Sequence, residues 1–175
     1  MTEDKKTSAQ SFTFKAETKQ LLNILIHSLY KDKEVFLREL LSNASDALNR
    51  VHFEMLTNQN VLDADVELNI RITADKDERM LTIQDTGIGM TKDEIIENLG
   101  TIAQSGARNF IEATKDAEED LAQVIGQFGV GFYSVFMAAE WVRVTSRSYK
   151  PRAKAVSWYA TGEDDFEISP AEMNE

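Results

Sequence analysis

Apolar and polar positions repeat along the chain with two different periods, and each period predicts a type of secondary structure. The helical period, with apolar residues every three or four positions, occurs in residues 17–30, 36–51, 92–99, about 108–114 and 133–139. A capping box marks the start of the helix over 92–99, because Thr91 suits the N-cap and Glu94 follows three residues later. The sequence therefore predicts five helices.

The strand period, with strict alternation of apolar and polar residues, occurs in residues 11–15, 66–73, 80–84, 141–146 and 153–160. Turns at 75–78 and 148–152 would join the last four segments into two antiparallel hairpins. Since alternation leaves one face of each strand polar, helices should cover only one face of the sheet. The predicted fold is an α+β two-layer sandwich with a mixed, mostly antiparallel sheet.

Length and composition favour one globular domain. The chain has 175 residues, of which 42% are hydrophobic, and contains nine Phe, four Tyr and two Trp. Residues 1–11 are polar, so we expect a flexible N-terminus ahead of a domain spanning 12–175.

Charge and residue usage narrow the function classes. With 19 basic and 30 acidic residues the net charge is −11, which argues against a nucleic-acid partner. The absence of cysteine excludes disulfides, zinc–cysteine sites and thiol nucleophiles. Neither a signal peptide nor an apolar run long enough for a membrane span is present, so a cytoplasmic protein without a membrane partner is expected.

Three polar side chains lie on one face of the helix predicted around Phe36–Leu48. Glu39, Asn43 and Asp46 stand at offsets of four and seven, which places Glu39 and Asn43 about 6 Å apart along the axis. They border the apolar stripe, where a carboxylate and an amide suit metal coordination and water activation in a cleft. The alternative interpretation is the solvated outer face of an amphipathic helix.

The segment Asp85–Met90, DTGIGM, places a carboxylate at the end of a predicted strand. Gly87 and Gly89 permit a tight turn and the close approach of a ligand. A carboxylate only accepts hydrogen bonds, and adenine offers an exocyclic amino donor that guanine lacks at the corresponding position. Asp85 is therefore a candidate for reading an adenine edge, with an ordinary β-turn as the alternative.

A second glycine-bearing segment, GQFGVGF at 126–132, leads into a predicted helix. Glycines at this position leave N–H groups free and allow phosphate oxygens to approach the backbone. The segment lacks the Gly-Lys-Ser/Thr of a P-loop and is not part of a βαβ unit. It predicts a phosphate-binding loop, and a structural hinge is the alternative.

Four motifs in order carry a resemblance to a known family: FLRELLSNASDAL at 36–48, DTGIGM, NLGTIAQSG at 98–106 and GQFGVGF. From about residue 12 onward the chain resembles the N-terminal nucleotide-binding domain of the ninety-kilodalton heat-shock chaperones, bacterial type, in the GHKL ATPase superfamily. The resemblance implies binding of ATP or ADP with Mg²⁺. The glycines of DTGIGM and GQFGVGF bracket about forty residues, which predicts a mobile lid over about residues 88–130. The resemblance also implies that the chain is a fragment of a longer ATP hydrolase, which forms a homodimer and assists unfolded client proteins through domains absent here.

The same resemblance assigns a role to individual residues. Glu39 would be the general base that orients the attacking water, Asn43 would coordinate Mg²⁺, and Asp85 would bind the adenine amino group. The base and sugar pocket would be lined by Asp46, Gly89, Met90, Asn98, Leu99 and Phe132. The phosphates would receive backbone N–H groups from Gly129, Val130 and Gly131.

One departure from the family pattern concerns hydrolysis. Gln104 stands where the family usually has a lysine near the phosphates, and an arginine supplied by a following domain is absent. We therefore expect nucleotide binding with weak or negligible hydrolysis by this fragment. The alternatives are another GHKL protein, namely a histidine kinase, topoisomerase or mismatch-repair ATPase, or a non-hydrolysing interaction module switched by nucleotide. The kinase is disfavoured because Glu39, one turn before Asn43, implies attack by water.

Overall fold

The computed structural model describes residues 9–27, 33–100, 104–115, 123–125 and 130–173. Its helical elements are α1 (Ala16–Ile26), α2 (Val35–Thr57), α3 (Lys92–Gly100), α4 (Gln104–Lys115) and the short 3-10 helix η1 (Gly131–Met137). Its strands are β1 (Gln10–Thr13), β2 (Ile70–Asp75), β3 (Met80–Asp85), β4 (Val142–Ser146), β5 (Val156–Ala160) and β6 (Asp165–Pro170). The predicted helices and strands are thus present, with their ends shifted by a few residues.

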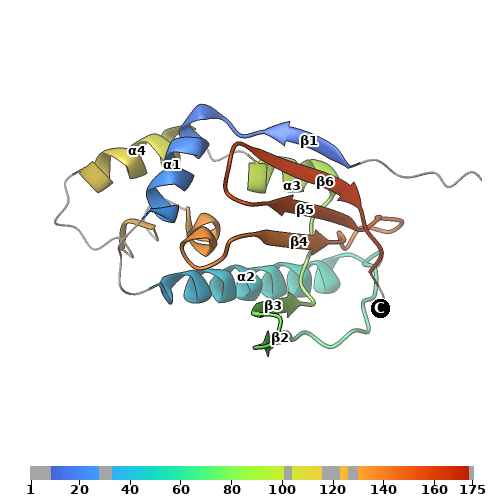
Figure 1. Cartoon of the computed structure of the whole chain (residues 1–175). Coiled ribbons are helices and arrows are strands. Elements are labelled where there is room, and N and C mark those ends of the chain that lie inside the picture. Colours follow the sequence, from blue (N-terminus) through green and yellow to red (C-terminus); the bar gives the residue numbers. More distant parts are fainter. Residues whose placement is uncertain (1–8, 28–32, 101–103, 116–122, 126–129, 174–175) are drawn as a thin grey trace, which may run out of the picture.

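The strands form two antiparallel sheets. One has four strands in the order β1-β6-β5-β4, and the other is the β2–β3 hairpin alone. In Figure 1 the four-stranded sheet runs beside α1, α2 and α3, and the hairpin lies near α2, which β3 contacts. The predicted α+β class is confirmed.

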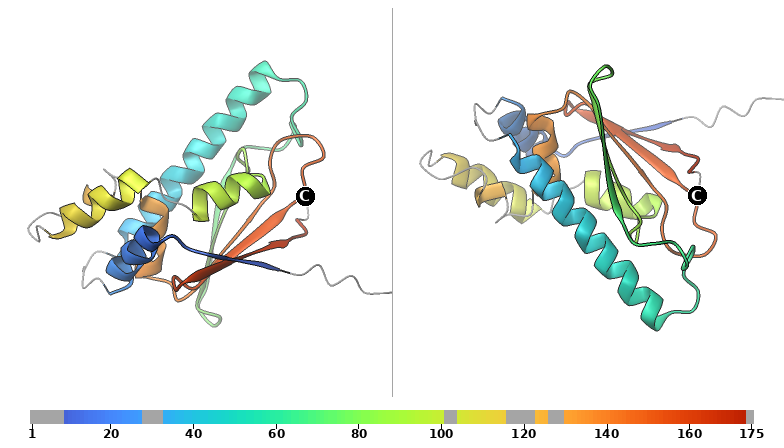
Figure 2. Two further views of the ribbon diagram at one scale, coloured as in Figure 1. Left: turned by 90° about the horizontal axis from the view of Figure 1, so that it is seen from above. Right: turned by 90° about the horizontal axis from the view of Figure 1, so that it is seen from below.

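The two faces of the four-stranded sheet differ in polarity, as the alternating pattern predicted. Trp158, Phe166 and Ile168 point from one face into the core and are buried. Phe14 and Phe132 pack edge-on against Trp158, with ring centroids 6.4 Å and 5.6 Å away. Figure 2 shows the helices on this side of the sheet, which makes the domain two layers thick.

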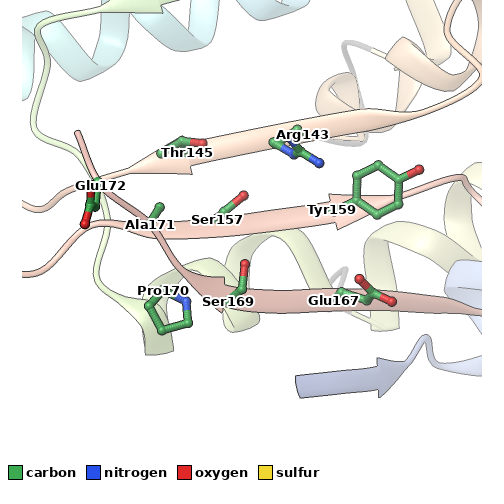
Figure 3. Close-up of a pocket in the computed structure, with 9 residues that line it drawn as sticks. All are labelled: Arg143, Thr145, Ser157, Tyr159, Glu167, Ser169, Pro170, Ala171 and Glu172. Carbon is green, nitrogen blue, oxygen red and sulfur yellow. The ribbon is translucent and has the colours of Figure 1, made fainter. Parts of the chain in front are cut away.

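The opposite face of the sheet is polar and has a shallow hollow of about 450 Å³. Figure 3 shows how adjacent strands line it with side chains in two rows. In the strand register Arg143 pairs with Tyr159, which pairs with Glu167, and beside that row lie Thr145, Ser157 and Ser169. This face is the solvated side of the sandwich.

Three features differ from the sequence-based expectation. The 131–137 segment is a 3-10 helix, and β6 was not predicted, although Phe166 and Ile168 alternate with polar residues there. The acidic residues around that pair hid the strand period. The hairpin is mostly exposed, with Ile72 at 49% of its full accessibility, because β2 and β3 pair only with each other.

Within the described ranges, no helix combines the length and the apolar character that crossing a membrane requires.

Candidate functional site

Helix α2 connects the two glycine-bearing segments that the sequence singled out. Near its start, Glu39 contacts Gly131 of η1, and two turns later Ala47 contacts Gly87 beside β3. The eight residues from Glu39 to Ala47 rise about 12 Å along a helix axis. Asn43 and Asp46 lie between these two contacts on exposed positions of the same helix. The helix face is therefore bounded by DTGIGM at one end and by Gly131 at the other.

At the first end, the Glu39 side chain lies directly over the backbone of Gly131. A Cβ added to Gly131 would lie 2.9 Å from Glu39 Cδ, so only glycine leaves the carboxylate in this place. The start of η1 is held by two further bonds, from Ser134 Oγ to the Gly131 carbonyl at 2.5 Å and from the Tyr133 N–H to the Val130 carbonyl at 3.1 Å. Gly129 lies outside the described residues.

At the second end, Asp85 is the last residue of β3. Its Oδ1 accepts the Gly87 N–H at 2.9 Å, which shapes the turn after the strand. Partial removal from water raises the pKa of the Asp85 carboxyl, and the Gly87 N–H opposes that rise because it stabilises the charged form. A carboxylate held in this way can accept a hydrogen bond from a donor group of a ligand.

Each glycine of DTGIGM has its own packing reason. A Cβ on Gly87 would lie 2.5 Å from Ala47 Cβ, and the neighbouring Ile88 N–H donates to the Ala47 carbonyl at 3.0 Å. Gly89 has a φ of +62°, and a Cβ there would lie 2.7 Å from the Arg147 carbonyl carbon. The segment thus fits between α2 on one side and the β4–β5 loop on the other.

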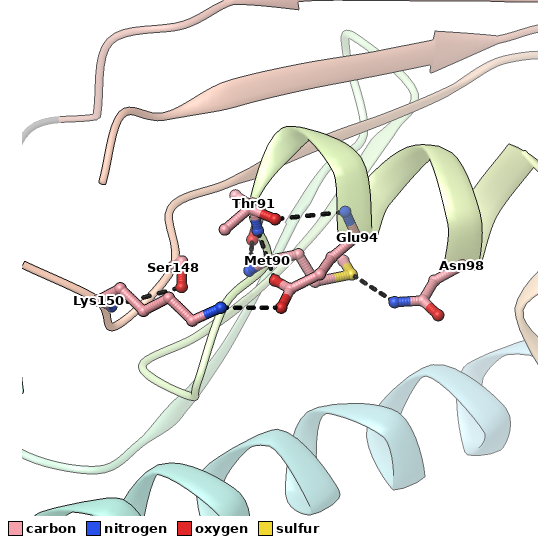
Figure 4. A network of polar contacts seen from close by, with 7 residues as sticks. Met90, Thr91, Glu94, Asn98, Ser148 and Lys150 are labelled. Atoms are coloured by element: carbon pink, nitrogen blue, oxygen red, sulfur yellow. Dashed lines mark hydrogen bonds and ion pairs between the residues drawn. The ribbon is translucent and has the colours of Figure 1, made fainter. Parts of the chain in front are cut away.

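Helix α3 begins with the predicted capping box. The Thr91 N–H donates to Glu94 Oε2 at 2.8 Å, and the Glu94 N–H donates to Thr91 Oγ1 at 3.3 Å. Both bonds are in Figure 4, together with the contact of Asn98 Nδ2 with Met90 Sδ at 3.8 Å and the bond from Lys150 to Glu94. Met90 and Asn98, both predicted to line the pocket, are therefore neighbours.

A residue that sequence reasoning missed joins α3 to η1. The Tyr133 hydroxyl donates to the Leu99 carbonyl at 2.5 Å, and burial raises the pKa of Tyr133. In the sequence, Tyr133 could be noticed only because it follows Phe132, the last residue of GQFGVGF. No sequence pattern indicated that its partner would be Leu99, 34 positions away. Phe132 itself stacks edge-on against Tyr133, with ring centroids 5.4 Å apart, and is half-buried in the core.

Asn43, the residue expected to hold Mg²⁺, is accessible to a ligand. Its side chain is exposed and forms no hydrogen bond in the described part of the chain, and the same is true of Asp46, which is predicted to line the base and sugar pocket. Mg²⁺ usually takes one or two protein ligands and completes its shell with water and phosphate oxygens. A single amide oxygen from Asn43 is compatible with this pattern. Across the described ranges, no three His, Asp or Glu residues are grouped as a metal site.

Parts of the predicted site are not described by the structure or do not line a hollow. Gln104 is the first residue of α4, and its side chain lies outside what the structure describes. The two hollows do not include the predicted site residues. One is on the polar sheet face, and the other, also about 450 Å³, lies beside DTGIGM towards the end of α2 and is lined by Asn49, Arg50, Phe53, Glu54 and Ile88.

Comparison with known proteins decides the family. Residues 30–172 match the family described as "Histidine kinase-, DNA gyrase B-, and HSP90-like ATPase". The chain belongs to this ATPase family. It is 50% identical over 160 residues to the chaperone protein HtpG of Chlorobium chlorochromatii (strain CaD3), covering 91% of this chain and 25% of the relative. For the proteins of the same name from Desulfitobacterium hafniense (strain Y51) and Yersinia pestis, the identity is 51% over 157 residues and 48% over 163 residues.

The matches cover most of this chain but only part of each relative. The matched regions cover 89% and 93% of this chain but 26% of each of the latter two relatives. The chain therefore spans about a quarter of the length of the curated relatives it matches. Nucleotide binding is common to the ATPases of this family.

Proposed function

We propose that this chain is the ATP-binding domain of a chaperone ATPase of the HtpG type, and that α2 is the floor of the nucleotide site. The observation that carries the proposal is the double contact of α2, with Gly131 near Glu39 and with Gly87 near Ala47. A nucleotide has an anionic end and a base end. The distance of about 12 Å between the two contacts suits such an elongated ligand.

In this proposal the base end lies at β3. Asp85 would accept the adenine amino group, and its partial removal from water strengthens that hydrogen bond. Gly89, Met90, Asn98 and Leu99 would line the pocket at the start and end of α3, with Asp46 approaching from α2 and Phe132 from η1. The close packing of Gly87 on Ala47 holds Asp85 against the helix.

The phosphate end would lie at the start of η1, where Gly129, Val130 and Gly131 would offer N–H groups. Asn43 would hold Mg²⁺, which when bound would neutralise phosphate charge. Glu39 would orient the attacking water and receive its proton, and its contact with Gly131 keeps the carboxylate at the phosphate end. The chain alone would hydrolyse ATP weakly, because Gln104 replaces a lysine and further domains of the longer protein would complete the site.

The proposed lid over about 88–130 needs a fixed base. In α3, Ile95 and Leu99 are buried, and a Cβ on Gly100 would lie 2.5 Å from the Phe166 ring. These contacts favour α3 as part of the fixed body, and because Phe110 and Ile125 further along the proposed lid are also buried in the core, closure would have to rearrange their contacts. In the longer protein, lid closure would promote homodimer formation in the cytoplasm and the assisted folding of client proteins.

Nucleotide-dependent unfolding tests the proposal. ADP and ATP with Mg²⁺ should raise the melting temperature of the chain in a dose-dependent way, because a ligand that binds only the folded state stabilises it by mass action. GTP at the same concentrations should have little effect. Equal shifts with ATP and GTP would remove the adenine assignment, and no shift with any nucleotide, confirmed by calorimetry, would refute the proposed function.

Phosphate release separates hydrolysis from mere switching. The full-length protein should release phosphate from ATP, and the present chain should do so far more slowly. If neither hydrolyses ATP while both bind it, the domain is a nucleotide-switched interaction module.

A further inference from the structure

The β4–β5 loop lies along DTGIGM, in the part of the candidate site where the base would bind. We define the clasp as residues 146–149, the end of β4 and the first three residues of the loop. The Met90 N–H donates to Ser146 Oγ at 2.9 Å, and the Tyr149 N–H donates to the Ile88 carbonyl at 2.9 Å. Between these two bonds, Gly89 lies against the backbone of Arg147. Three consecutive residues of DTGIGM therefore contact the clasp.

The clasp is itself anchored on its far side. The Leu62 N–H donates to the Tyr149 carbonyl at 2.8 Å, and Arg147 forms an ion pair with Asp63 at 2.5 Å. One residue beyond, Lys150 contacts Glu94 of α3 at 3.3 Å. A loop held at both sides is a fixed support, so its contacts determine where residues 88–90 lie.

Ser146 differs from the other members of the clasp because it acts through its side chain. It is the last residue of β4, pairs with Val156 in the sheet, and has only 9% of its surface exposed. The sheet therefore fixes the position of Oγ. This oxygen accepts a partly buried backbone donor that would otherwise need another acceptor.

We propose that Ser146 is a positioning residue for the base end of the nucleotide site, acting by holding the Met90 backbone through the hydrogen bond to its Oγ. This inference rests on the proposed function, since it concerns how Asp85 and Met90 are presented to adenine. Ser146 acts on the ligand only through Met90. Its hydroxyl keeps residues 88–90 in the shape that the base requires.

The decisive experiment compares alanine substitutions at three serines with a threonine substitution at Ser146, which keeps the hydroxyl. Ser146→Ala should weaken ADP binding about tenfold in calorimetry, because the base-side segment is no longer held in its binding shape. Ser146→Thr should restore affinity to within about threefold, since it retains the acceptor in a strand position that suits threonine. Ser157→Ala and Ser169→Ala, on the polar face of the same sheet, are matched controls and should leave affinity unchanged.

Hydrogen exchange gives a second measurement. In the unaltered protein, where no variant has to fold, the Met90 amide should exchange slowly. In Ser146→Ala the Met90 amide should exchange faster, while buried amides of β5 keep their rates. A Met90 amide that exchanges freely in the unaltered protein would overturn the inference. So would equal ADP affinity for Ser146→Ala and the unaltered chain, or equal losses for the Ala and Thr variants. Failure of the unaltered chain to bind ADP would instead refute the proposed function.

Discussion

The Glu39 carboxylate lies so close to the backbone of Gly131 that a Cβ on Gly131 would come within 2.9 Å of Glu39 Cδ. The two residues are 92 positions apart in the sequence and belong to α2 and η1 (Figure 1). The glycine thus has a second use beside the proposed exposure of its N–H group. It leaves room for the carboxylate that we propose as the general base.

Gly131→Ala should move Glu39 without unfolding the domain. The overlapping atoms are the far end of a flexible side chain, so the change should cost about 0.5–1.5 kcal/mol, as for a strained rotamer. In the full-length protein, ATP hydrolysis should fall towards the rate of Glu39→Ala, while ADP affinity changes little. Urea unfolding and phosphate release measure the two effects. Full activity of Gly131→Ala beside an inactive Glu39→Ala would contradict the proposed contact.

Asp85→Asn should weaken ADP binding at least tenfold. The variant keeps an Oδ1 that can accept the Gly87 N–H, so the turn survives. It loses the charge that strengthens the bond to the adenine amino group, a difference of about 1.5–3 kcal/mol. Calorimetry measures the affinity, and Asp77→Asn in the exposed hairpin turn is the control. An unchanged affinity would remove Asp85 from the site.

Although Asp85→Asn should weaken ADP binding, the raised pKa of Asp85 predicts that the same substitution stabilises the folded chain near neutral pH. Because the folded protein retains this proton to higher pH than the unfolded chain, the contribution of Asp85 is fully present below its ordinary pKa of 3.8. It is lost as the pH rises through the folded pKa. Without nucleotide, Asp85→Asn should therefore melt at a higher temperature than the unaltered chain at pH 7, and the difference should shrink towards pH 3.8. A lower melting temperature at pH 7 would contradict burial as the cause.

Glu94 should matter more to stability than its partner Lys150. Glu94 accepts the Thr91 N–H and completes the capping box of α3, which is worth about 0.5–2 kcal/mol. Its ion pair with Lys150 is at the surface and contributes about 1 kcal/mol or less. Urea unfolding of Glu94→Ala and Lys150→Ala should rank them in that order, and 1 M NaCl should remove most of the Lys150 effect. The reverse order would show that the ion pair holds α3.

Local patterns in the sequence predicted most of the elements, because period and capping depend on neighbours within a turn. The stripe of α2, the capping box at Thr91 and the hairpin β2–β3 are of this kind. The strand β6 was missed because acidic residues surround its two core positions, Phe166 and Ile168. The 3-10 form of η1 was missed because its residues also fit the apolar period of an ordinary helix.

The candidate site likewise has parts that local sequence patterns predict and parts that they do not. Helical spacing predicted that Glu39 and Asn43 lie on one face of a helix, and the structure has α2 over these residues. The supports of the site depend on contacts between distant positions, such as Ser146 with Met90, separated by 56 residues. No local period encodes such a pair, since a buried serine at a strand end is common in any sheet. The roles assigned to the site residues stay predictions.

The hydroxyl of Tyr133 on the Leu99 carbonyl has one more consequence. This bond connects the last turn of α3 to the start of η1 and so joins opposite ends of the proposed nucleotide site. A rotation of η1 would pull on α3 through this bond as well as through the core that both helices share. Such a linkage would couple occupancy of the proposed phosphate end to affinity at the proposed base end, and Tyr133→Phe should weaken that coupling.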